Sequence, residues 1–100
     1  MKKIPKSFEI LGHHITVELR DDLLAESDAW GVCHFHQHKI ELQSPVKGLN
    51  LAPSHYLATF WHEATHMFLY TLGHMEMAQD EAMVDQIAQA IHQVMKSAKY

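Results

Sequence analysis

The sequence predicts an α+β fold, in which an antiparallel β-sheet from the N-terminal half packs on two C-terminal helices. Short segments with alternating apolar and polar residues occur in the first half of the chain, as is typical of half-buried strands. Two longer segments with apolar residues at helical spacing follow. A length of 100 residues leaves room for one core. We therefore expect a single domain over residues 1–100, with a β region and a connection in 1–53 and helices in 54–73 and 79–96.

Two short segments near the N-terminus predict the first β-hairpin. Residues 8–11 and 14–19 alternate between apolar and polar side chains, and Gly12 and His13 lie between them as the expected turn. A glycine between two such segments favours a tight turn. The polar residues 21–28 come next, and they predict a turn region with a brief helical turn at 22–25.

Residues 30–35 and 40–43 predict a second hairpin. With residues 36–39 as its loop, Cys33 would lie opposite Leu42, and the apolar side chains would share one face of the sheet. Cys33 is then expected inside the fold as a small, unreactive side chain.

Residues 54–73 predict one long helix. Pro53 precedes the segment and Gly73 follows it, and these are common start and stop signals for a helix. Apolar side chains recur along the segment at helical spacing: Leu57, Phe60, Trp61, Ala64, Met67, Phe68 and Leu72.

The middle of this predicted helix carries the pattern H-E-x-x-H. His62 and His66 are four residues apart, so on a helix both imidazoles lie on one face and can bind one zinc ion. Glu63 lies beside them, where its carboxylate could take a proton from zinc-bound water. The pattern indicates a zinc-dependent hydrolase with Zn²⁺ as its cofactor and Glu63 as its catalytic base.

A catalytic zinc ion usually has three protein ligands, and the third must come from outside this motif. The candidates follow the motif helix in sequence: His74, Glu76, Asp80, Glu81 and Asp85. Glu81 and Asp85 share an otherwise apolar face of the helix predicted for residues 79–96, and an acid on a packing face needs a partner. We therefore expect Glu81 to bind the metal and Asp85 to accept a hydrogen bond from a ligating histidine. Asp85 and His74 are the alternatives for the third ligand.

These residues resemble the gluzincins, a family of zinc peptidases whose third ligand is a glutamate on a helix after the motif helix. Their thermolysin-like members also carry an aspartate four residues after that glutamate, as Asp85 follows Glu81 here. The 14 residues between His66 and Glu81 are fewer than in large gluzincins, and the small size looks more like the ImmA/IrrE-like and phage-encoded minimal zincins. The resemblance covers residues 30–95. It implies hydrolysis of a peptide or protein substrate that lies against a sheet edge, for which residues 40–43 are the candidate.

Composition argues against several other classes of function. A net charge of −4 and the absence of a Lys/Arg run argue against binding to nucleic acid. The single cysteine, Cys33, excludes an internal disulfide and a Cys-based zinc finger. No apolar run reaches the length of a membrane span. We therefore expect a cytoplasmic protein with neither a nucleic-acid partner nor a membrane partner.

Two other functions fit the same residues. A zinc ion could stabilise a non-catalytic protein-interaction module, or the same zinc chemistry could act on a bond other than a peptide bond. Only a catalytic site has a use for the carboxylate of Glu63 beside its metal ligands. In a peptidase a further donor would stabilise the oxyanion, and the sequence leaves three candidates for it: Tyr56, Tyr70 and His74.

Overall fold

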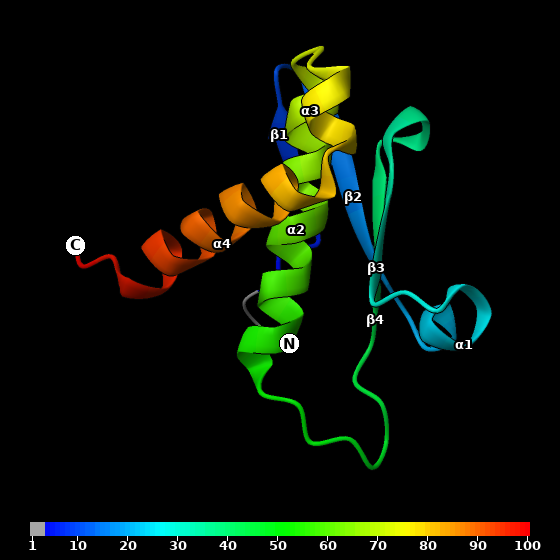
Figure 1. Ribbon diagram of the computed structural model, residues 1–100. Coiled ribbons are helices and arrows are strands. Elements are labelled where there is room, and N and C mark those ends of the chain that lie inside the picture. Colours follow the sequence, from blue (N-terminus) through cyan, green and yellow to red (C-terminus); the bar gives the residue numbers. More distant parts are fainter. Residues whose placement is uncertain (1–3) are drawn as a thin grey trace.

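A four-stranded sheet carries one long helix across one face, and two further helices follow in the chain (Figure 1). The computed structural model describes residues 4–100. The strands are β1 (Ser7–Ile10), β2 (His13–Arg20), β3 (Gly31–His34) and β4 (Lys39–Gln43). The helices are α1 (Leu23–Ser27), a 3-10 turn (Phe35–Gln37), α2 (Pro53–Thr71), α3 (Met75–Gln79) and α4 (Glu81–Ser97). The predicted α+β fold class is confirmed.

The sheet is mixed rather than antiparallel, which corrects the prediction. Its strand order is β1-β2-β4-β3. The pairs β1–β2 and β3–β4 are antiparallel, but β2 and β4 run parallel. β4 pairs with both β2 and β3 and so joins the two hairpins into one sheet. Its inner position fits its burial, because it has the most buried side chains of the four strands: Ile40, Glu41, Leu42 and Gln43. A strand that is covered on both faces is stable inside a sheet, where its backbone groups are also paired on both sides.

The interior position of β4 also overturns its prediction as a sheet edge. The edges are β1 and β3. Polar contacts cover the second face of β4. Glu41 lies 3.4 Å from the guanidinium group of Arg20, and the side-chain oxygen of Gln43 accepts a hydrogen bond of 2.6 Å from the backbone of Leu24 in α1. The strands with an unpaired edge are therefore β1 and β3, and both contact α2.

The register of the second hairpin differs from the prediction by two residues. Cys33 lies opposite Ile40, not Leu42. The reason is the 3-10 turn at Phe35–Gln37, which takes Phe35 out of the strand and is closed by a hydrogen bond of 3.1 Å from the His38 amide to the Phe35 carbonyl. Because side chains alternate with a period of two, this shift leaves Cys33 on the same face as Ile40 and Leu42.

The first hairpin is present, but its turn lies one residue earlier than predicted. Ile10 lies opposite His13, and the turn between them is made by Leu11 and Gly12, not Gly12 and His13, with φ angles of 49° and 82°. Positive φ at both central residues is typical of the type I′ turn, which matches the twist of the two strands. The brief helical turn expected after this hairpin is present as α1.

One apolar face of α2 packs on the sheet. The buried residues of this interface form a single cluster: Ile15, Ile40, Leu42, Phe60, Ala64 and Met67. Burial of each of the larger side chains contributes roughly 1.5–3 kcal/mol. Because this face of α2 is held against the sheet, His62 and His66 lie on a different side of the helix, which faces α3 and α4.

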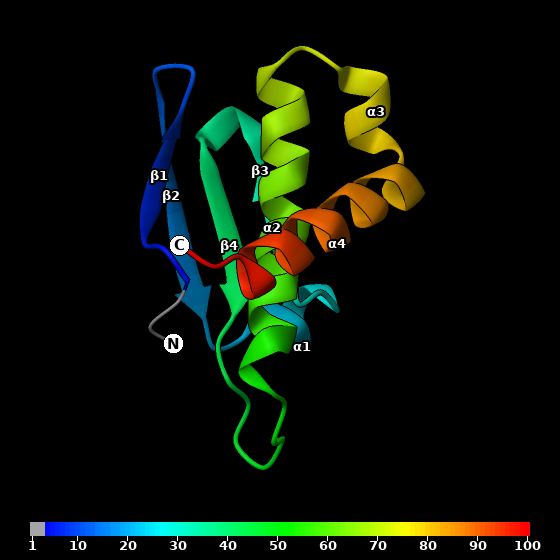
Figure 2. The same cartoon turned by 90° about the vertical axis from the view of Figure 1, so that its left-hand side faces the viewer.

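The segment after α2 contains a helix that the sequence analysis did not predict. Where a short connection was expected, α3 precedes α4, and Asp80 caps α4 by accepting a hydrogen bond of 3.1 Å from the Met83 amide. Figure 2 shows α4 crossing α2. The first half of α4 is packed more deeply than the second, since Val84 and Ala88 are buried whereas Met95 is 51% exposed. The C-terminal part of the apolar face of α4 is more exposed because the two helices cross at an angle.

Candidate metal centre

Two helices bring the predicted zinc ligands together. His62 and His66 lie in the middle of α2, and Glu81 is the first residue of α4. The Nε2 atoms of His62 and His66 lie 3.1 Å and 3.2 Å from the two carboxylate oxygens of Glu81. One possible ligand atom from each residue lies within 4.8 Å of the others. Two imidazoles and one carboxylate form a known ligand set of catalytic zinc, so these residues fit a zinc ion.

The other candidates for the third ligand lie outside this group. His74 is exposed at the N-terminal cap of α3, and Glu76 is exposed in the first turn of the same helix. Asp80 caps α4. Asp85 lies behind His62, with its Oδ1 atom 3.4 Å from Nδ1 of the imidazole. This is the position expected for a carboxylate that orients a ligating histidine.

A backbone carbonyl orients the second histidine. Nδ1 of His66 lies 2.7 Å from the carbonyl oxygen of Ala78 in α3. Because a carbonyl oxygen only accepts, Nδ1 carries the hydrogen, and Nε2 keeps its lone pair for a metal. The sequence analysis missed this contact, since every residue has a carbonyl and no residue type marks the one that is used.

The three ligands open into a concave site between α2 and β3. Its volume is about 430 Å³, and its walls are formed by Gly31, Val32, Cys33, His62, Glu63, His66, Tyr70 and Glu81. The His66 side chain is 10% exposed, whereas the Glu81 side chain is 71% exposed. The site is therefore closed on the histidine side and open to solvent on the side of Glu81, where a substrate could enter.

Glu63 is buried beside the ligands, with 8% of its surface exposed. Burial of the carboxyl group is the largest influence on its pKa and raises it. The nearby His62 and His66 act to lower the pKa, while the carboxylate of Glu81 raises it again. A hydrogen bond with the Cys33 backbone lowers it slightly, and the net result is a raised pKa. Glu63 therefore holds a proton more readily than a solvated glutamate does.

Gly31 is a residue of the candidate site that was not singled out from the sequence. A Cβ atom at this position would lie 2.8 Å from Cγ of Glu63 and 2.9 Å from Cγ2 of Thr59. Only a glycine lets β3 approach α2 this closely at Glu63. A signal was available, because an isolated glycine in a strand pattern often marks close approach of another element.

The concave site distinguishes the three candidates for an oxyanion donor. Tyr70, one turn after His66, lines the site, and its ring stacks on Phe35 at a centroid distance of 5.0 Å. Tyr56 is buried near the N-terminal end of α2, and His74 lies outside the walls of the site. Tyr70 is therefore the candidate that lines the site, with its ring centroid 6.5 Å from that of His66.

Cys33 also lines the site, across from α2. Burial of its thiol, with a smaller effect from the nearby Glu63, raises the pKa of Cys33 to about 12. The thiol is therefore protonated at neutral pH, as expected for an unreactive side chain.

Comparisons with protein families, with curated protein sequences and with solved structures give no match to this chain. Among residues 4–100, none of the helices combines the length and the apolarity that a membrane span requires.

Proposed function

We propose that this chain is a zinc-dependent peptidase that acts on a peptide or protein in the cytoplasm. The observation that carries the proposal is the convergence of His62, His66 and Glu81, whose ligand atoms lie within 4.8 Å of one another, beside the buried carboxyl group of Glu63. A zinc ion held by these three residues would lower the pKa of a water molecule towards about 7 and would polarise a substrate carbonyl group.

Glu63 supplies the proton transfers in this proposal. Its carboxylate accepts the proton that the attacking water loses, and it returns that proton to the nitrogen of the leaving amine. Burial beside Gly31 also holds the side chain in place, since Cγ of Glu63 has little room on the side of β3.

β3 and Tyr70 provide the contacts to the substrate. β3 is an edge strand whose residues Gly31, Val32 and Cys33 line the concave site. An extended peptide could pair with this edge through backbone hydrogen bonds, with its scissile bond near the ligands. The hydroxyl group of Tyr70 would then donate a hydrogen bond to the oxyanion that forms at the carbonyl. The sequence analysis assigned the substrate edge to residues 40–43, and the strand order moves this proposal to β3.

The test combines metal content with turnover. Purified protein should bind about one zinc ion per chain by elemental analysis, and Glu81→Ala should lose most of it. Glu63→Gln should keep the zinc and the fold but reduce the rate of peptide hydrolysis, measured on a peptide library, by roughly 10²–10⁴-fold. Glu76→Ala is the matched control, because Glu76 is an exposed acid on α3 outside the ligand group.

Two results would overturn the proposal. A native chain that takes up no zinc, even on titration, has no metal centre. A chain that binds zinc through Glu81 but hydrolyses no peptide, with or without Glu63, is not a peptidase, and it fits the two alternatives that the sequence also allowed, a zinc-stabilised interaction module or a hydrolase of another bond.

A further inference from the structure

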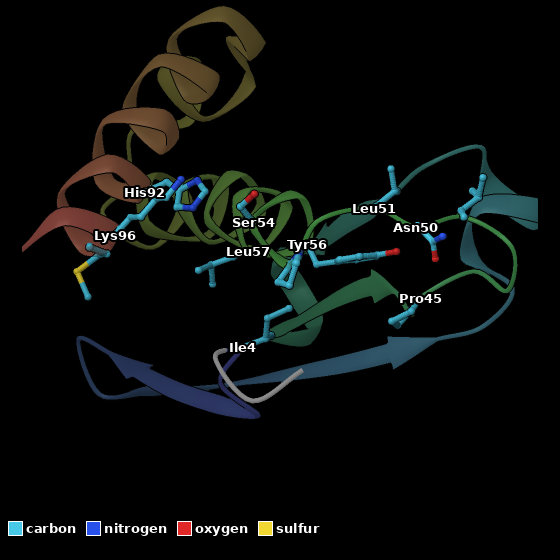
Figure 3. A pocket seen from close by; sticks show the side chains of 12 residues that line it. Ile4, Pro45, Asn50, Leu51, Ser54, Tyr56, Leu57, His92 and Lys96 are labelled. Atoms are coloured by element: carbon cyan, nitrogen blue, oxygen red, sulfur yellow. The ribbon is translucent and has the colours of Figure 1, made fainter.

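A second and larger concavity lies at the N-terminal end of α2, away from the metal ligands. It has a volume of about 720 Å³, within the range of roughly 300–1,000 Å³ that is common for small-molecule sites. None of its lining residues lines the candidate metal centre. We call it the α2–α4 groove; the residues that matter most here are Ile4, Leu49, Leu51, Leu57, His92 and Lys96 (Figure 3).

The α2–α4 groove is mainly apolar, and part of its apolar surface faces solvent. Leu49 is 48% exposed, Leu51 is 37% exposed and Met95 is 51% exposed. Scattered apolar residues are normal on a protein surface, but apolar residues gathered around one concavity mark a binding site. Removal of this surface from water would contribute to binding in proportion to the area that the ligand covers.

Charge is distributed unevenly around the α2–α4 groove. The residues that line it include no Asp or Glu, although the whole chain has a net charge of −4. They include one lysine, Lys96, and one histidine, His92. Figure 3 shows Lys96 and His92 together at the α4 end of the groove, whereas Pro45 and Leu51 lie at the other end. A ligand would therefore meet positive charge at one end and apolar side chains along the rest.

Two polar atoms of the groove residues are buried without a partner. Within residues 4–100, neither Nε2 of His92 nor Oη of Tyr56 has a hydrogen-bond partner. A buried polar atom without a partner costs roughly 1–3 kcal/mol. His92 is only partly buried, so a rotation of its side chain would let the imidazole pair with a polar group at the Lys96 end of the groove.

We propose that the α2–α4 groove binds an amphiphilic anion, which has an apolar body of medium length and one carboxylate or similar head group. The apolar body lies against Leu49, Leu51 and Leu57, and the head group pairs with Lys96 and His92. The groove is concave and can enclose a small molecule. Its shape therefore favours a small ligand rather than the flat surface of a membrane. This inference is independent of the proposed peptidase function.

The test uses dodecanoate below its micelle concentration as the probe. Titrated into the full chain and followed by ¹H–¹⁵N NMR, it should bind saturably and shift the signals of residues 45–57 and 92–96. Lys96→Gln should weaken binding about tenfold, because one charged hydrogen bond is lost. Leu49→Asp should weaken binding by more than tenfold, since it places a negative charge against the anion.

Matched controls come from the sheet. Leu19 is 49% exposed, almost as much as Leu49, and Leu19→Asp should leave dodecanoate binding unchanged. Lys39→Gln removes a lysine that lies 3.9 Å from Glu18 on the sheet and should also have no effect. Glu81→Ala should retain binding, which shows that the carboxylate of the probe is not held at the metal centre.

Three results would overturn the inference. The first is no saturable binding, or binding that Leu49→Asp leaves intact. The second is equal affinity for dodecanol, which would show that the head group is not recognised. The third is sedimentation with phosphatidylglycerol vesicles without binding of monomeric dodecanoate, which would identify a membrane surface as the partner.

Discussion

The middle of α2 carries the imidazoles of His62 and His66 and faces the carboxylate of Glu81, whereas its N-terminal end faces leucines, Pro45 and Lys96. The difference follows from α4, which crosses α2 and brings Glu81 to the metal ligands and Lys96 to the groove. An acid in the first turn and a lysine in the last turn also suit the dipole of α4. Glu81 and Lys96 therefore stabilise α4, and they also give the metal centre and the groove their different charges.

The largest expected effect comes from the core that both regions share. Met67 is fully buried between α2 and the sheet, so Met67→Ala should lower the free energy of unfolding by roughly 2–5 kcal/mol. Urea denaturation would measure it. Met83→Ala, at a side chain that is 36% exposed, should change the same quantity by less than about 0.5 kcal/mol. Loss of zinc binding while the groove stays folded would show that the two regions do not share one cooperative core.

The next effect should be confined to the metal centre. In Gly31→Ala the new methyl group would meet Glu63, Thr59 and the Leu42 side chain at 2.8–3.1 Å. We expect a loss of roughly 1–3 kcal/mol of stability and reduced turnover, but unchanged binding of dodecanoate.

Gly48→Ala is the companion variant for Gly31→Ala. A Cβ atom at Gly48 has no neighbour within 4 Å, but its φ of +88° strains any other residue. It should cost roughly 1–2 kcal/mol without affecting turnover. Equal turnover in the two variants would argue that contact between β3 and Glu63 is unimportant for catalysis.

A smaller effect is expected from the residue behind the first histidine. Asp85→Asn removes the charge that lies 3.4 Å from Nδ1 of His62 and should weaken zinc affinity by roughly 10–100-fold. Competition with a chromophoric chelator would measure this, with Glu76→Gln as the control. An unchanged affinity would mean that Asp85 does not orient His62.

The smallest effect concerns a buried carboxylate on the other face of the sheet. Burial alone would raise the pKa of Glu41, but the hydrogen bond from His34, at 2.5 Å, and nearby positive charges lower it overall. Glu41 therefore contributes stability above the ordinary pKa of 4.5, and this contribution is lost as the pH falls through its lowered pKa. The stability difference between the native chain and Glu41→Gln should shrink in acid. A difference that is constant with pH in urea denaturation would contradict this.

Much of the fold could be predicted from local pattern. Pro53 and Gly73 marked the ends of α2 to within two residues, and Gly12 marked the first turn. Alternation also identified the strands, but it reports only which side chains share a face. The order of strands depends on which strand is covered on both faces, and the buried polar residues Glu41 and Gln43 hid this property of β4.

In the candidate site, too, some residues could be predicted from local pattern and others depend on the tertiary arrangement. Glu81 and Asp85 could be singled out because charges on an apolar helix face need partners, and the structure brings both to His62. The carbonyl of Ala78 could not, since its role depends on α3 folding back over His66. The exposure of Met95 could not be predicted either. The spacing of apolar residues along one helix does not indicate the angle at which it crosses another helix.

The sulfur of Cys33 has a consequence for how oxidants act on the site. A thiolate is the form that peroxide oxidises. With its pKa raised to about 12, the thiol of Cys33 stays protonated at neutral pH. An oxidising environment therefore finds no reactive sulfur beside the candidate ligands.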